Sequence, residues 1–224
     1  MHKSKCNFFF ILILIISSYG CGEESTPVLE KNQADYEGII LAIGDSLTEG
    51  LGVEEKFAYP AVLQRKLFEN GYMYKVVNAG VSGETSSGAL SRLKWALTLQ
   101  PAIAILVTGA NDGLRGIDPE LIKTNISSIV QVLKEKDIVV VLGGMQMVQN
   151  LGQDYTTAFS KIYPQIAQDQ DVILIPFFLA AVGGKADLNQ SDGIHPTAEG
   201  YRIIVENIYP YIMEAIRMHR SNSK

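Results

Sequence analysis

Cysteine is nearly absent from this chain of 224 residues. Its two cysteines, Cys6 and Cys21, both lie close to the N-terminus, which excludes a disulfide framework in the folded part of the chain. Histidine is scarce as well, because only His195 lies in the body of the sequence, while His2 and His219 lie near its ends. One usable histidine and no usable cysteine make a poor zinc site, so we expect no metal.

Positive charge is also lacking. The formal net charge is −5 at pH 7, and no basic stripe runs through the body of the chain, which argues against a nucleic-acid partner. The basic residues Arg217, Arg220 and Lys224 stand at the very end, and residues 217–224 are predicted to form a solvated tail. Neither GxxxxGKS/T nor GxGxxG occurs, so nucleotide binding has no support.

One hydrophobic run stands out near the N-terminus, at residues 8–16 (FFFILILII). It follows Lys3 and Lys5 and precedes small and polar residues, which is the pattern of a secretory signal. The run is shorter than the roughly 20 apolar residues that a transmembrane helix needs. We therefore expect residues 1–20 to be a signal peptide and the protein to be exported.

The end of this signal resembles a bacterial lipobox, in which a cysteine becomes the lipidated first residue of the mature protein. Residues 18–21 read SYGC, with small Gly20 before Cys21 but with Ser18 where leucine is usual. The resemblance implies a membrane-anchored lipoprotein facing the periplasm or the cell surface. Simple cleavage to a soluble periplasmic or secreted protein and an uncleaved anchor are the alternatives. Residues 21–37, polar and containing Pro27, are predicted to form a flexible tether.

From residue 38 onward, strand-like and helix-like segments alternate. Apolar runs of strand length occur at residues 38–43, 75–78, 102–108, 138–142 and 172–176, and most lack the polar alternation of half-exposed strands. Helical spacing occurs at residues 60–69, 86–99, 119–135 and 154–168, and a last helix is expected at 197–217, kinked at Pro210. This alternation predicts an α/β fold, a single-domain doubly wound α/β/α sandwich with a mostly parallel five-stranded sheet, over residues 38–216.

Polar and glycine residues gather where the predicted strands end, which is where open α/β sheets bind ligands. Ser46 follows the first strand, where its hydroxyl could be an exposed nucleophile or could only cap the next helix. Gly80 follows the second strand and could direct its N–H at a ligand oxygen, or could be a plain turn residue. Asn111 follows the third strand, where its amide could donate to an oxyanion or form an Asx turn.

The stretch DGIHP at residues 192–196 contains the single histidine of the body. Asp192, three residues before His195, can reach Nδ1 of the ring and fix its tautomer, so that Nε2 can take a proton from a serine. A purely structural Asp–His pair is the alternative. A nucleophile, a base, an orienting acid and oxyanion donors together are what acyl transfer by serine requires.

These segments match, in order and spacing, the blocks of the SGNH (GDSL) hydrolase family: GDSL at 44–47, a block centred on Gly80, GAND at 109–112, and DGIHP. The sequence is similar above all to exported acyl-CoA thioesterases, lysophospholipases and arylesterases, from residue 38 to about residue 211. The resemblance implies a flavodoxin-like fold, a triad of Ser46, Asp192 and His195, and an oxyanion hole of the Ser46 N–H, the Gly80 N–H and the Asn111 side chain. It implies no cofactor.

The resemblance also bears on the substrate, which it implies is a lysophospholipid, an acyl thioester or an aryl ester, hydrolysed through an acyl-enzyme. In that branch, the loop after the fourth strand lines the acyl pocket, so we expect Met147, Val148 and Leu151 to contact an acyl chain. A carbohydrate O-acetyl esterase and a lipoprotein that binds a ligand without turnover are the alternatives. No obligate protein partner is evident.

Overall fold

Five parallel strands form one sheet in the computed structural model, which describes residues 36–147 and 151–222. The strands are β1 (Gly38–Gly44), β2 (Tyr74–Gly80), β3 (Ile103–Val107), β4 (Val139–Gly143) and β5 (Ile173–Ile175). They lie in the order β2-β1-β3-β4-β5, and every neighbouring pair is parallel. This is the flavodoxin-like order, and it confirms the predicted α/β fold.

Several predictions made from the N-terminal sequence fall outside the described residues. These are the signal peptide at 1–20, the lipidated Cys21 and the tether as far as residue 35. Within the described part of the chain, no helix is both long and apolar enough to cross a bilayer.

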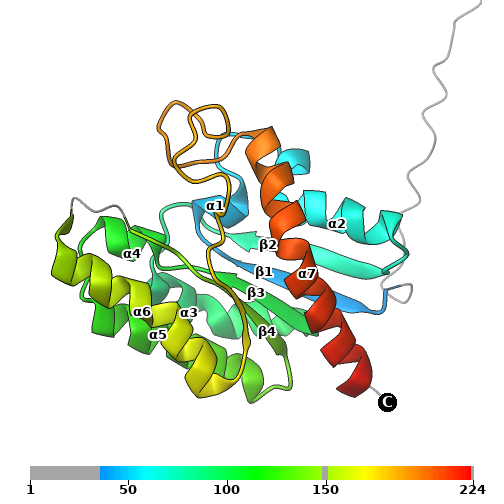
Figure 1. Ribbon diagram of the computed structural model, residues 1–224. Helices are drawn as coiled ribbons and strands as arrows, with labels where there is room; N and C mark the ends of the chain where they lie inside the picture. Colours follow the sequence, from blue (N-terminus) through cyan, green and yellow to red (C-terminus); the bar gives the residue numbers. More distant parts are fainter. Residues whose placement is uncertain (1–35, 148–150, 223–224) are drawn as a thin grey trace, which may run out of the picture. The chain divides into compact units, whose positions relative to one another are not determined.

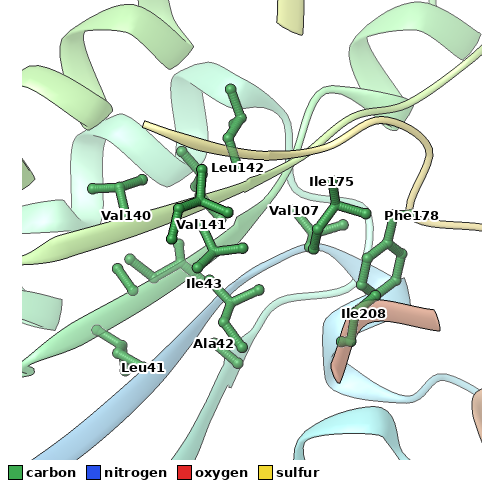
Figure 2. Close-up of a cluster of buried hydrophobic side chains, with 14 of the residues drawn as sticks. Leu41, Ala42, Ile43, Val107, Val140, Val141, Leu142, Ile175, Phe178 and Ile208 are labelled. Carbon is green, nitrogen blue, oxygen red and sulfur yellow. The ribbon is translucent and has the colours of Figure 1, made fainter. Parts of the chain in front are cut away.

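The centre of the sheet is buried on both faces. Every residue of β3 and β4 is buried, which matches their unbroken apolar sequences. Figure 2 shows Ile43, Val107 and Val141 of the central strands in one cluster with Phe178 and Ile208. Because Phe178 follows β5 and Ile208 belongs to the last helix, this cluster fixes the C-terminal third of the chain on the sheet.

Helices cover both faces of the sheet (Figure 1). In one layer, α2 (Tyr59–Glu69) packs against α7 (Ala198–Asn222), and α7 contacts β3, β4 and β5. The other layer consists of α3 (Ser86–Ala96), α5 (Pro119–Lys134) and α6 (Gln153–Gln170). In the described part of the chain, the connections include the 3₁₀ turns η2 (Glu55–Phe57) and η3 (Leu97–Leu99).

Helix α5 shows why these segments fold as they do. The Asp118 side chain accepts a hydrogen bond from the Glu120 N–H, and Pro119 occupies the first turn, so the sequence marks the start of the helix. Ile122, Ile126, Ile129, Val130 and Leu133 recur at helical spacing and are all buried. The helix therefore presents one apolar stripe to the core and a polar face to solvent.

The C-terminal segment differs from the prediction of a solvated tail. Helix α7 continues to Asn222. Arg220 donates two hydrogen bonds of 2.9 Å to the Glu37 carboxylate, and His219 Nδ1 lies 2.8 Å from the Tyr74 hydroxyl. Residues 217–222 are therefore largely exposed as predicted but helical, because Arg220 and His219 find partners where β1 and β2 begin and these contacts hold the last turns of the helix; residues 223–224 lie outside the described part of the chain.

The strand order creates a switch point between β1 and β3, whose carboxyl ends border the crevice in which such sheets bind ligands. Two short helices begin there, α1 (Ser46–Glu49) directly after β1 and α4 (Ala110–Leu114) directly after β3. Ser46 and Asn111 therefore reach the same crevice from neighbouring strands.

Candidate active site

Ser46 occupies a tight turn between β1 and α1. A side chain at Gly44 would collide with Thr48, so only glycine permits this turn. Asp45, the residue before Ser46, caps helix α1, because its carboxylate accepts a hydrogen bond of 3.0 Å from the Leu47 N–H. The Ser46 hydroxyl is therefore not needed as the cap.

The Ser46 hydroxyl contacts the histidine of the C-terminal motif. The distance from Ser46 Oγ to His195 Nε2 is 2.8 Å, and the distance from His195 Nδ1 to Asp192 Oδ2 is 2.7 Å. The other oxygen of Asp192 accepts the N–H groups of Ile194 and His195, each at 3.0 Å. The hydrogen bond to the His195 side chain, together with these two N–H groups, lowers the pKa of Asp192 to about 2, so its carboxylate stays charged far into the acid range.

The Asn111 amide reaches the same crevice from the start of α4. Its Nδ2 donates a hydrogen bond of 3.0 Å to the Glu84 carbonyl and a longer one of 3.4 Å to Asp45 Oδ2. Ser46, Asn111 and His195 line one pocket. The structure therefore brings together the predicted nucleophile, base, orienting acid and amide donor.

Gly80 is not placed as the sequence suggested. Its N–H donates a hydrogen bond of 2.9 Å to Asn78 Oδ1. A side chain at Gly80 would collide with the backbone of Glu49, so the glycine is needed for α1 to pack closely against the end of β2. Gly80 lines a neighbouring hollow and does not line the pocket of Ser46. Its assignment as an oxyanion donor is corrected on these grounds.

Gly83, rather than Gly80, lies in the wall of the pocket. It has a φ of +74° and lines the pocket together with Ser46 and Asn111. Its carbonyl accepts a hydrogen bond of 2.8 Å from the Arg115 guanidinium, which fixes the peptide that joins Gly83 to Glu84. The sequence offered one usable signal. Gly80 is the last residue of β2, whereas Gly83 lies in the loop beyond, where backbone N–H groups are less often committed to a strand.

The pocket has a volume of about 530 Å³ and opens beside Ser46. Of the three predicted acyl-contacting residues, Met147 lines it, Leu151 does not, and Val148 lies outside the described residues. Leu151 stands close to the start of α6, beyond the part of the loop that reaches the pocket. Sequence reasoning missed most of the apolar lining, which comes from several segments without a motif: Leu51, Leu114, Met145, Phe177, Leu179 and Ile194.

A largely buried ion pair between Arg92 and Glu84 supports the Asn111 amide, because the Glu84 carbonyl accepts a hydrogen bond from that amide. Arg92 donates to both oxygens of the Glu84 carboxylate, at 2.5 and 2.6 Å, and also donates 2.7 Å to the Ala79 carbonyl near the end of β2. The exposed fractions of the Arg92 and Glu84 side chains are 18% and 8%. Because the Glu84 carbonyl holds Asn111, this pair fixes the segment that orients the amide. Removing one partner would leave a buried charge without its counterpart.

Asp45 is a buried carboxyl beside these groups, with a residue exposure of 1%. Burial raises its pKa from 3.8 to about 6, although the Leu47 N–H acts in the opposite direction. The charged form is therefore less favourable in the folded chain than in the unfolded chain. The stability cost is absent below about pH 4, grows as the pH rises through the interval between the two pKa values, and is fully present above about pH 6.

We therefore expect the variant Asp45→Asn to gain stability relative to the wild type as the pH rises from 4 to 7. The amide has no charge to desolvate, and its oxygen can still cap the Leu47 N–H. The difference in unfolding free energy between the two proteins should shift by on the order of 1–3 kcal/mol over this range. Urea unfolding at pH 4, 5, 6 and 7 measures the shift. A difference that does not change with pH would contradict it.

Comparison with known proteins assigns the chain that carries this site to a family. Residues 42–203 match the model of the GDSL-like Lipase/Acylhydrolase family. The chain belongs to this family. The match spans the strand ends that carry Ser46 and Asn111 and the loop that carries His195, and it confirms the resemblance noted in the sequence.

Members of the family with assigned activities are similar over most of the chain. Esterase TesA of Pseudomonas aeruginosa is 40% identical over 172 residues, which cover 76% of this chain and 86% of the relative. Thioesterase 1/protease 1/lysophospholipase L1 of Escherichia coli is 37% identical over 180 residues, covering 80% and 85%. The crystal structure of the esterase EstA from Pseudoalteromonas sp. superposes with a TM-score of 0.76 at 31% identity, covering 80% and 98%. The chain is accordingly an ester hydrolase of the GDSL-like family.

Proposed function

We propose that Ser46 is the nucleophile of this esterase, His195 its general base and Asp192 the acid that orients His195. The observation that carries the proposal is the chain of hydrogen bonds from Asp192 through His195 to Ser46, at 2.7 and 2.8 Å, beside an apolar pocket. The charged Asp192 keeps the proton on Nδ1 of the ring. This leaves Nε2 as the acceptor for the serine proton.

The proposed cycle has two halves. Ser46 Oγ attacks the carbonyl carbon of the ester while its proton moves to His195, and the resulting oxyanion is held by the N–H groups of Ser46 and Gly83 and by the Asn111 amide. The bond to the leaving group then breaks, and His195 returns the proton to the departing alcohol or thiol. Water next gives a proton to His195 and attacks the acyl carbon. The bond from that carbon to Ser46 Oγ then breaks, His195 returns the proton to Ser46 Oγ, and the acid leaves.

We propose an acyl ester or acyl thioester with an apolar chain as the substrate. The pocket beside Ser46 has about 530 Å³ and is lined largely by apolar side chains, which suits a hydrocarbon chain better than a carbohydrate. The thioesterase and lysophospholipase activities named for the Escherichia coli relative belong to this class. A carbohydrate O-acetyl esterase needs room for only an acetyl group, so the pocket favours it less. A lipoprotein that only binds a ligand would not need the series of hydrogen bonds that joins Asp192, His195 and Ser46.

Chain-length preference tests the substrate class. Met147 lines the pocket and packs over Gly113, where an added side chain would collide with it. The variant Met147→Ala should lose more kcat/KM on long-chain p-nitrophenyl esters than on the acetate, since each buried methylene is worth about 0.8 kcal/mol, or about fourfold in rate. The matched control is Leu151→Ala, on the same loop but outside the pocket, which should affect all chain lengths evenly. An even loss for Met147→Ala would assign this residue to folding.

We further propose that residues 1–20 are a signal peptide, that Cys21 is lipidated, and that residues 21–37 tether the hydrolase domain to a membrane. The proposal is supported by the order of basic residues, apolar run, small residues, cysteine and polar segment. A flexible tether of this length spans on the order of 20 Å root-mean-square. The enzyme would then work close to a source of lipid esters.

Fatty-acid labelling in cells tests the anchor. The wild type should incorporate label and sediment with membranes, whereas Cys21→Ala should do neither. The variant Cys6→Ala is a matched control, because Cys6 precedes the apolar run and should be removed with the signal. If the wild type takes up no label, plain secretion replaces lipid anchoring.

A further inference from the structure

The loop that carries His195 is fastened to the segment that carries Ser46 at a second point besides the two reacting groups. The Gln190 side-chain amide donates a hydrogen bond of 2.7 Å to the Leu51 carbonyl and another of 3.0 Å to the Pro196 carbonyl. Pro196 directly follows His195. Gln190 therefore bridges the strand-end segment of the nucleophile and the loop of the base.

Leu51 is itself held to the nucleophile. Its N–H donates to the Ser46 carbonyl at 3.1 Å, and the Gly50 N–H donates to the same oxygen at 3.0 Å. A displacement of the Leu51 peptide is thus transmitted to the backbone of Ser46. A side chain at Gly52, where φ is +80°, would collide with the Gln190 amide, which shows how closely the two segments approach at this point.

The main chain of Gln190 stabilises the loop that carries His195. Its N–H donates to the His195 carbonyl at 2.7 Å, and its carbonyl accepts the Gly193 N–H at 2.9 Å. Asn189 pairs with Pro196 as an isolated antiparallel bridge, which closes the base of the loop. Main chain and side chain of Gln190 therefore both fix the backbone at His195 and Pro196.

Resting on the proposed roles of Ser46 and His195, we propose that Gln190 is a positioning residue for the esterase reaction. It sets the separation of nucleophile and base by joining their two segments through the Leu51 and Pro196 carbonyls. It touches neither substrate nor reacting atoms. Without the bridge, each loop keeps its own internal hydrogen bonds, but the 2.8 Å contact between Ser46 Oγ and His195 Nε2 loses its lateral support. A misplacement of about 1 Å between reacting groups can cost on the order of 100-fold in rate.

The variants Gln190→Met and Gln190→Glu, in the full-length protein, test this role. Both preserve the length of the side chain and remove the amide N–H donors. We expect kcat on a p-nitrophenyl ester to fall roughly 10- to 100-fold, with KM changed less than about threefold. Titration of Ser46 with a p-nitrophenyl phosphonate should label the whole sample, but the rate of labelling should fall by the same factor as kcat.

The matched control is Gln170→Met. Gln170 also donates two hydrogen bonds from its amide, at 3.0 and 2.7 Å, to the Ser127 carbonyl and hydroxyl, and it lies outside the pocket. The variant Gln170→Met should lower the melting temperature about as much as the Gln190 variants do, and it should leave kcat unchanged. An equal loss of kcat in this control would show general destabilisation and overturn the proposal. So would a loss in the Gln190 variants that is fully explained by a smaller titratable fraction.

The variant Ser46→Ala distinguishes a failure of the proposed function from a failure of the role proposed for Gln190. If Ser46→Ala keeps its turnover, the catalytic assignment on which this inference rests is wrong. If Ser46→Ala is inactive and both Gln190 variants retain the wild-type kcat, the catalytic assignment holds and Gln190 has no positioning role. Should Gln190→Met fail to fold, Gln190→Glu alone decides between these outcomes.

Discussion

The variant Ser46→Ala should hydrolyse p-nitrophenyl esters roughly 10⁴–10⁶-fold more slowly in kcat than the wild type. The nucleophile and base act as a unit, so the remaining activity comes only from the oxyanion donors and from binding in the pocket. The substitution removes one oxygen from a residue that is 8% exposed, together with its hydrogen bond to His195. Since such a bond contributes about 1 kcal/mol net, the melting temperature should change by only a few degrees.

The variant His195→Ala completes the same test. It should cost nearly as much activity as Ser46→Ala, and the double variant should lose little more than either single one, because both groups serve the same proton transfer. Steady-state kinetics on the three proteins, with active-site titration of the wild type, measures the coupling. Losses that add on a logarithmic scale would separate the two residues. Substantial turnover by Ser46→Ala on every ester would favour the binding-lipoprotein alternative.

The prediction from sequence succeeded where chemistry concentrates in short motifs. Ser46, Asn111 and His195 stand directly after strands or in a compact DGIHP motif, and unbroken apolar runs locate the strands. Since parallel strands align their carboxyl ends, local signals of this kind imply that the residues meet. The same reasoning found the sheet and its helices, and it placed the end of the last helix too early because the partners of Arg220 lie far away in sequence.

The errors concern residues whose role depends on distant contacts. Only the strand end distinguishes Gly80 from Gly83 in the sequence, and the close approach of Glu49 to Gly80 is the contact that assigns Gly80 to packing. Gln190 belongs to no recognisable motif. Its role depends on Leu51, which lies 139 residues earlier in the chain, so no local pattern reveals it. Phe177 lines the pocket only because β5 delivers the following loop to the crevice. Such tertiary contacts leave no periodic pattern for a sequence argument to detect.

The variant Asn111→Ala should lower kcat by roughly 10²–10³-fold and change KM little, as expected when one preorganised donor to a developing oxyanion is removed. The amide is held ready by the Glu84 carbonyl at 3.0 Å, which is fixed in turn by the ion pair of Glu84 with Arg92. Because that support is present before substrate binds, the amide is oriented in advance, and the N–H that makes the longer hydrogen bond of 3.4 Å to Asp45 Oδ2 is the one that would turn to the oxyanion. Steady-state kinetics with p-nitrophenyl esters measures the effect.

Two comparisons make the Asn111 test specific. The variant Asn207→Ala removes a partly buried amide that donates 2.8 Å to the Ala180 carbonyl from α7 and does not line the pocket, so it should shift the melting temperature without a matching loss of kcat. In Asn111→Ala itself, binding of a phosphonate whose oxygen mimics the oxyanion should weaken by the same factor as kcat/KM, because the donor acts on the transition state. If kcat falls while phosphonate binding does not change, Asn111 shapes the pocket and the oxyanion is held by the backbone donors alone.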